Sequence, residues 1–97
     1  KTGLAIEIPR WHVGLLFPRS SVYKTGQLLT NCVGVIDSGY RGEIMMKFTL
    51  SRFQREYDIG DRVGQLIIIP YPKIQFEEVT ELIPTDRGSG GYGSTGK

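Results

Sequence analysis

The chain has little of what metal and disulfide chemistry needs, because it holds one cysteine and one histidine among its 97 residues. Cys32 cannot form an internal disulfide, and one histidine with one cysteine cannot close a zinc site. Since Cys32 lies in an apolar stretch, we expect a packed thiol in a reduced compartment. The sequence also lacks an apolar run of the roughly 18 residues that span a membrane, and it begins without a signal-peptide pattern. These absences predict a soluble, cytoplasmic protein with no membrane partner.

The chain also lacks a large excess of positive or negative charge. Twelve basic residues are nearly balanced by ten acidic residues, which leaves a formal net charge of +2. The basic residues are scattered along the chain, so bulk electrostatics predict no nucleic-acid partner, and any anion site must be local.

The length fits one domain with a modest core, to which oligomerisation would add stability.

No segment reaches the roughly ten residues of helical period expected of an α-helix. The sequence instead shows short apolar runs bounded by Gly and Pro, which are typical of strands. A hairpin is expected between residues 4–8 and 13–17 across a turn at 9–12, followed by a serine-capped helical turn at 19–25. Further strands are expected at residues 28–31, 33–36, 43–50, 62–70 and 74–83. This pattern predicts an all-β barrel or jelly roll.

Two expectations concern packing. Residues 62–70 hold three successive isoleucines, which are too β-branched for a comfortable helix. We therefore expect a central strand that is buried on both faces. Residues 51–60 form a polar connection, in which Tyr57 and Ile59 should point inward.

The C-terminal residues 84–97 are rich in glycine and cannot form a core. Within them, residues 88–93 satisfy G-x-G-x-x-G and residues 91–97 satisfy most of a P-loop. Both phosphate-binding motifs require a preceding strand and a following helix, and no helical pattern follows here. Composition alone leaves two interpretations open, a disordered linker or a lid that closes over a ligand.

A single carboxylate, Asp37, lies between an apolar run and a glycine-rich turn in residues 31–43. Taken alone, an aspartate before Ser-Gly is most often a turn former. Together with residues 18–21, 60–65 and 87–97, however, this segment resembles, in the same order, four of the five motifs of the trimeric dUTPase family. The first motif, a strand around Ala-Gly-Tyr-Asp-Leu, has no counterpart here. We therefore expect the chain to lack the N-terminal strand of that family.

The resemblance implies an all-β fold of the β-clip type, a jelly-roll-like distorted barrel, in a homotrimer with shared active sites. Residues 1–83 would form the dUTPase-like barrel domain, and residues 84–97 would form a mobile C-terminal arm. The implied reaction is hydrolysis of dUTP to dUMP and pyrophosphate, in which Asp37 activates the water that attacks the α-phosphate. Tyr40 would pack beneath the deoxyribose and leave no room for a 2′-hydroxyl.

The resemblance also implies the remaining substrate contacts. On the mobile arm, Arg87 would meet the terminal phosphates and Tyr92 would stack on uracil. The cofactor would be Mg²⁺, held through substrate phosphates and water and by no direct protein ligand. The residues expected to bind substrate are Arg19, Ser20, Ser21, Asn31, Gly34, Val35, Ile36, Tyr40, Gln65, Arg87, Gly91, Tyr92, Gly93 and Ser94.

Two alternatives remain open. One is a dUTPase-like nucleotide-binding or regulatory module without turnover, because the first motif is absent. The other is a dCTP deaminase, which shares the fold and a related serine motif. Deaminases place a glutamate ten residues after the aspartate, where this chain has Lys47. They also lack the glycine-rich arm, so dUTP hydrolysis is the preferred prediction.

Overall fold

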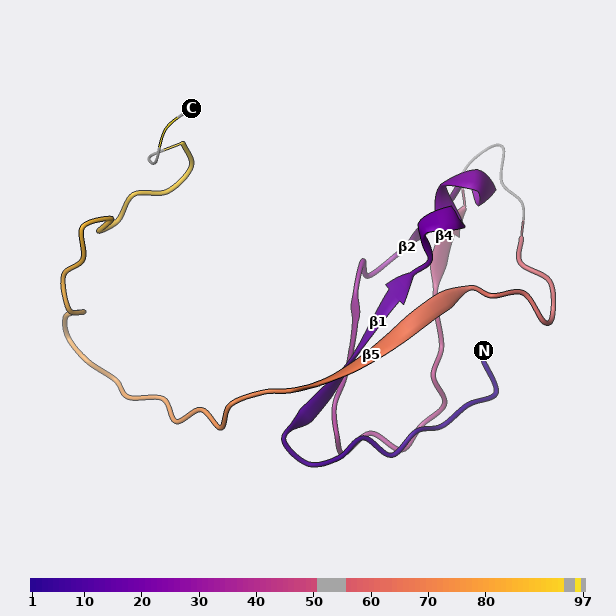
Figure 1. Cartoon of the computed structure of the whole chain (residues 1–97), viewed down its shortest axis with the longest axis horizontal. Coiled ribbons are helices and arrows are strands. Elements are labelled where there is room, and N and C mark those ends of the chain that lie inside the picture. Colours follow the sequence, from indigo (N-terminus) through magenta and orange to yellow (C-terminus); the bar gives the residue numbers. More distant parts are fainter. Residues whose placement is uncertain (51–55, 94–95, 97) are drawn as a thin grey trace.

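The computed structural model describes residues 1–50, 56–93 and 96. A β-rich body is followed by an extended C-terminal segment, residues 71–93, which runs away from that body (Figure 1). The elements in chain order are β1 (His12–Pro18), η1 (Ser20–Thr25), β2 (Gln27–Leu29), β3 (Gly34–Ile36), β4 (Phe48–Leu50) and β5 (Gly64–Pro70). The regular elements of the described residues are thus short strands and one short 3-10 helix, and the prediction of an all-β fold is confirmed.

β1 is the central strand of a three-stranded antiparallel sheet in the order β3-β1-β5. Its register with β5 runs from His12 opposite Pro70 to Pro18 opposite Gly64. β2 and β4 form a second, two-stranded antiparallel sheet. The strands predicted at residues 28–31, 33–36 and 43–50 are present in part as β2, β3 and β4. The pairing of β1 with β5 brings the segment after Pro18 beside the segment before Gly64.

A small hydrophobic core packs against β1. Its buried side chains are Ile8, Leu16, Ile36 and Ile44, with Ile6, Met46 and Leu66 packed against them. Gly14 in β1 makes this packing close, since a Cβ at that position would lie 2.7 Å from Cδ1 of Ile8. The absence of a side chain in the strand therefore lets a residue from outside the sheet reach the core.

The N-terminal segment does not form the predicted hairpin. The Thr2 N–H donates to the Ile44 carbonyl at 3.1 Å, and the Ile44 N–H donates to the Leu4 carbonyl at 2.8 Å. The chain does turn at residues 9–12. The prediction is wrong because β3 and β5 already occupy the two edges of β1, so residues 4–8 run elsewhere.

Within the part of the chain that the structure describes, β5 is an edge strand with β1 on one side only. Its three isoleucines are exposed in this chain, by 46% at Ile67, 43% at Ile68 and 40% at Ile69. The prediction of a central strand buried on both faces is therefore wrong for the single chain. Three β-branched residues in a row favour a strand, but they do not determine which neighbours cover it.

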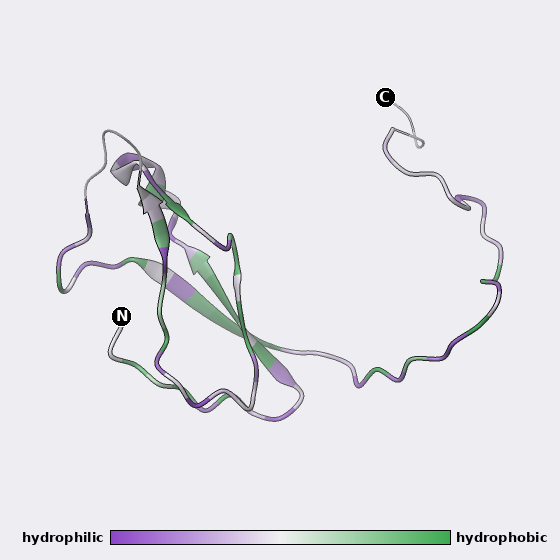
Figure 2. Cartoon of the chain, turned by 180° about the vertical axis from the view of Figure 1, so that it is seen from behind, coloured by the Kyte–Doolittle hydropathy of each residue, from purple (hydrophilic) through white to green (hydrophobic). Residues whose placement is uncertain are grey.

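Residues 74–83 do not form the predicted strand. Their large apolar side chains are exposed, from 50% at Val79 to 94% at Phe76, and hydrophobic residues recur along the extended segment (Figure 2). The described residues offer this segment no strand to pair with, so its apolar pattern alone does not make it one. The Cα radius of gyration is 18.9 Å, whereas a compact chain of this length would have about 12–13 Å.

Three local predictions are also wrong. Arg19, not a serine, is the N-cap of η1, and it makes no side-chain capping hydrogen bond. Cys32 is exposed rather than packed, in a backbone conformation with a φ of 61°. Ile59 is fully exposed, whereas the ring of Tyr57 packs against that of the β4 phenylalanine. The rest of the predicted connection, residues 51–55, lies outside the described residues.

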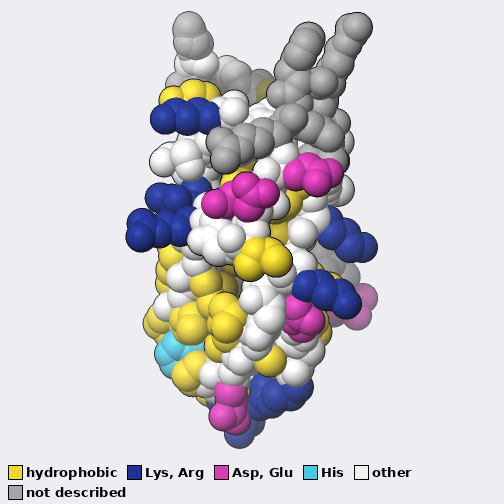
Figure 3. Space-filling view, turned by 90° about the vertical axis from the view of Figure 1, so that its right-hand side faces the viewer, with side chains coloured by type: hydrophobic (Ala, Val, Ile, Leu, Met, Phe, Trp, Pro, Cys, Tyr) yellow, Lys and Arg dark blue, Asp and Glu magenta, His cyan; other side chains and the backbone are white. Residues whose placement is uncertain are grey.

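The surface carries charges of both signs. On the face in Figure 3, Lys and Arg side chains are interspersed with Asp and Glu side chains and form no continuous patch of one sign. Within the ranges that the structure describes, no helix has the length and apolar character to cross a membrane.

Candidate functional site

A cavity of about 220 Å³ lies beside β3 and the turn that follows it. Its lining residues are Leu16, Asn31, Gly34, Val35, Ile36, Asp37, Tyr40, Glu43, Ile44 and Met45. Asn31, Tyr40 and residues 34–37 were all predicted as substrate-binding or catalytic residues. The structure thus brings six predicted residues to one place. Glu43 ends the segment that carries the family resemblance, and nothing in the sequence indicated the other three.

The turn after β3 positions the carboxylate and the ring at this cavity. Asp37 directly follows the last residue of β3, and the Tyr40 N–H donates to the Asp37 carbonyl at 3.1 Å. The Arg41 guanidinium fastens the same turn by donating to the Ser38 carbonyl at 2.8 Å. Asp37 is exposed, so its carboxylate is accessible to a ligand and to water.

Close packing shapes the rest of the small cavity. The Tyr40 hydroxyl donates to the Glu43 carbonyl at 2.9 Å, which folds the ring back over the turn. A Cβ on Gly34 would lie 3.3 Å from Cβ of Leu16 and 3.7 Å from the side-chain nitrogen of Asn31. The bare backbone of Gly34 therefore lets the Asn31 amide approach β3 closely.

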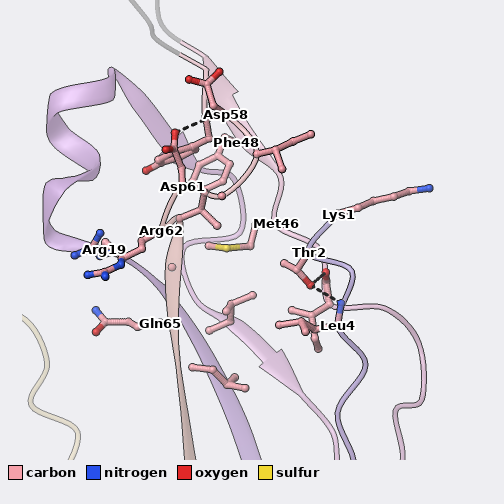
Figure 4. Close-up of a pocket in the computed structure, with 18 of the residues that line it drawn as sticks. Lys1, Thr2, Leu4, Arg19, Met46, Phe48, Asp58, Asp61, Arg62 and Gln65 are labelled. Atoms are coloured by element: carbon pink, nitrogen blue, oxygen red, sulfur yellow. Dashed lines mark hydrogen bonds between the residues drawn. The ribbon is translucent and has the colours of Figure 1, made fainter.

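A second, open cavity of about 1040 Å³ holds two further predicted residues, Arg19 and Gln65 (Figure 4). The register of β1 and β5 sets Gln65 opposite Phe17, and its side-chain amide donates to the Pro18 carbonyl at 3.3 Å. Figure 4 shows Arg19, Arg62 and Gln65 on the wall of this cavity. Arg62, which was not among the predicted substrate-binding residues, also lies on the wall of this cavity.

The remaining predicted residues lie apart from both cavities. Ser20 and Ser21 lie in η1, and neither lines a cavity described above. Arg87, Gly91, Tyr92 and Gly93 lie on the extended C-terminal segment, where Tyr92 is fully exposed. Ser94 lies outside the described residues. A single chain therefore does not assemble the whole predicted site.

The two cavities adjoin each other, because Leu16 and Ile44 line both of them. The small cavity holds Asp37, and the large cavity holds the cationic and amide groups of Arg19 and Gln65. The carboxylate and the donors suited to phosphate thus belong to separate cavities of one chain.

The donor set at the small cavity suits a hard cation only in part. Among the described residues, no group of three or more His, Cys, Asp or Glu side chains is placed to hold a metal ion. The carboxylates that line this cavity are Asp37 and Glu43, and Glu43 accepts a hydrogen bond from the Gly3 N–H at 2.9 Å. One accessible carboxylate fits a Mg²⁺ ion that keeps most of its water and is carried by phosphates.

The chain is similar to many dUTPases. The dUTPase family model matches residues 1–96. The deoxyuridine 5′-triphosphate nucleotidohydrolase of Acinetobacter baylyi is 43% identical over 101 residues, which cover 100% of this chain and 67% of that protein. The corresponding protein of Corynebacterium glutamicum is 46% identical, covering 99% of this chain and 66% of that protein. The chain spans about two thirds of the length of these curated relatives.

Solved structures show the same likeness. The dUTPase of Staphylococcus bacteriophage 80alpha with dUPNHPP has a TM-score of 0.74 and 26% identity, over 96% of this chain and 72% of that chain. A mutant dUTPase from phage phi11 of S. aureus, described as coordinating a structural Mg(II) ion, has a TM-score of 0.62 and 28% identity. It covers 79% of this chain and 67% of that chain.

Proposed function

The chain belongs to the dUTPase family, and we propose that it hydrolyses dUTP to dUMP and pyrophosphate. The observation that carries this proposal is the small cavity, which Asp37 and Tyr40 line together with the residues of β3. The relatives named above are nucleotidohydrolases of this substrate. We expect the reaction to take place in the cytoplasm, because the substrate belongs to the intracellular nucleotide pool.

The edge of β3 is suited to recognise uracil. Among the described strands, β3 pairs with β1 on one side only, so its other edge can present N–H and C=O groups in a fixed order. Such an edge can satisfy the Watson-Crick edge of uracil while mismatching cytosine. The Asn31 side chain, which lies close to Gly34, would add a contact to the base.

Asp37 is the proposed general base. Its carboxylate takes a proton from a water molecule, whose oxygen attacks the α-phosphorus of dUTP. The bond between the α-phosphorus and the bridging oxygen breaks, and pyrophosphate leaves. Arg19 and Gln65 would donate to phosphate oxygens and so stabilise the charge that develops on them. A Mg²⁺ ion carried by the triphosphate would neutralise further negative charge.

We propose that copies of the chain share these sites in a homotrimer. Asp37 and the pair Arg19 and Gln65 lie in separate cavities of one chain, and the extended segment of residues 71–93 runs away from the body that holds both. One copy would provide the nucleotide pocket, a second the phosphate donors, and a third the arm with Arg87 and Tyr92. The exposed isoleucines of β5 offer apolar surface for such contacts.

Subunit complementation tests this arrangement. Asp37→Asn and Gln65→Ala chains are assayed alone, where each should be inactive or nearly so. The two are then mixed, unfolded and refolded together. In a shared site, about a quarter of the sites should combine an intact Asp37 with an intact Gln65, so activity should return to about that fraction. No recovery on mixing, with each variant assembling normally, would show that one chain forms the site alone.

A further inference from the structure

The Tyr40 ring occupies the space where a side chain at position 42 would lie. A Cβ built on Gly42 would lie 2.6 Å from Cζ and 2.9 Å from Cε1 of Tyr40, and closer still to the phenol oxygen. Real Cβ atoms essentially never approach atoms beyond their own residue and its two chain neighbours within 3.0 Å. The ring and the glycine are therefore packed as a pair.

Backbone conformation does not account for this glycine. The φ of Gly42 lies outside the left-handed region, so other residues could adopt its backbone angles. Gly39 of the same turn also has a φ outside that region, but a Cβ there would meet no atom within 4 Å. The two glycines thus differ in whether a side chain would collide with the Tyr40 ring.

One hydrogen bond fixes the backbone of Tyr40, and another fixes its ring. The Tyr40 N–H donates to the Asp37 carbonyl at 3.1 Å, and the hydroxyl donates to the Glu43 carbonyl at 2.9 Å. The ring consequently spans Gly42 and lines the small cavity. Because a rigid ring cannot bend around a new Cβ, alanine at position 42 would displace the ring and break its hydroxyl hydrogen bond.

We propose that Gly42 is a positioning residue that sets sugar selectivity by holding the Tyr40 ring in place. This inference rests on the proposed function and on the packing of the ring beneath the deoxyribose that the family resemblance implies. A ring fixed over Gly42 leaves no space for a 2′-hydroxyl, whereas a displaced ring admits a ribonucleotide. Gly42 acts through Tyr40 and makes no contact with the substrate itself.

The first test compares Gly42→Ala with the matched control Gly39→Ala. Binding of dUMP and UMP is measured by calorimetry, since binding does not require turnover. The preference for dUMP over UMP should fall roughly threefold to tenfold in Gly42→Ala, the size of one lost hydrogen bond. It should stay unchanged in Gly39→Ala. An unchanged preference in Gly42→Ala would overturn the inference, even if that variant were less stable.

The second test repeats the substitution in a Tyr40→Ala background. Without the ring, Gly42→Ala should alter neither the dUMP to UMP preference nor the thermal midpoint, because the collision is gone. If Gly42→Ala alone fails to fold, the double variant should fold. Failure of both would overturn the inference, because Gly42 would then be needed for another reason.

One further measurement separates this inference from the proposed function. Hydrolysis of dUTP is assayed with the unaltered chain. Absence of hydrolysis, with dUMP still bound in preference to UMP, would count against the proposed function alone. Absence of dUMP binding by the unaltered chain would overturn both.

Discussion

Alanine at position 14 should destabilise the core, even though glycine usually weakens a strand. The added Cβ would lie 2.7 Å from Cδ1 of Ile8, 3.3 Å from Cβ of Ile36 and 3.4 Å from Cδ1 of Leu66. Overpacking of this kind destabilises the folded state by about 1–3 kcal/mol. Alanine also lowers the conformational entropy of the unfolded chain, which offsets about 0.4–1 kcal/mol of that loss. The free energy of unfolding should therefore fall by about 1–2 kcal/mol, which lowers the thermal midpoint by roughly 5–15 °C.

Urea unfolding at one fixed protein concentration measures this loss. Ile8→Val removes the Cδ1 atom that comes nearest to the added Cβ, and alone it should cost about 0.5–1.5 kcal/mol. In the Ile8→Val background, Gly14→Ala should cost clearly less than in the unaltered chain. Gly39→Ala, where nothing lies near the added atom, should stay within about 0.5 kcal/mol of the unaltered chain. Additive losses at positions 8 and 14 would refute the contact between Ile8 and Gly14.

Two further changes test the chemistry and the arm. Asp37→Asn keeps the shape of the side chain but removes the basic carboxylate, so turnover of dUTP should fall about 10²–10⁴-fold while dUMP binding is kept. Near-normal turnover in steady-state assays would show that Asp37 is not the general base. Deleting the chain after Asp86 should lower kcat but leave the oligomer mass unchanged by light scattering, because the arm acts only when the site closes. Dissociation of the oligomer would instead show that the residues after Asp86 hold the subunits together.

Separation along the chain decides how much of the site could be predicted. Asn31 and Tyr40 belong to one short segment, and both line the small cavity because β3 and the turn after it fix their spacing. Gln65 and Pro18 meet at 3.3 Å although 47 positions separate them. No local sequence pattern predicts this contact. In the sequence, only the resemblance to the family linked the two segments.

The wrong predictions concern which surfaces are covered. The isoleucines at 67–69 favour a strand, and β5 is one, but a β-branched run carries no information about neighbours. Residues 74–83 likewise show an apolar pattern without a partner strand among the described residues. Cys32 was assigned to the core by its apolar surroundings, yet it is exposed at a sharp backbone turn with a φ of 61°. Burial depends on the path of the chain as well as on composition.

The central claim is that water attacks the α-phosphorus of dUTP. Hydrolysis in ¹⁸O-labelled water, followed by mass spectrometry of both products, tests this claim most directly. We predict one labelled oxygen in dUMP and none in pyrophosphate, because the new P–O bond forms at the α-phosphorus. Label in pyrophosphate, or conversion of dCTP to dUTP in place of dUTP hydrolysis, would contradict it.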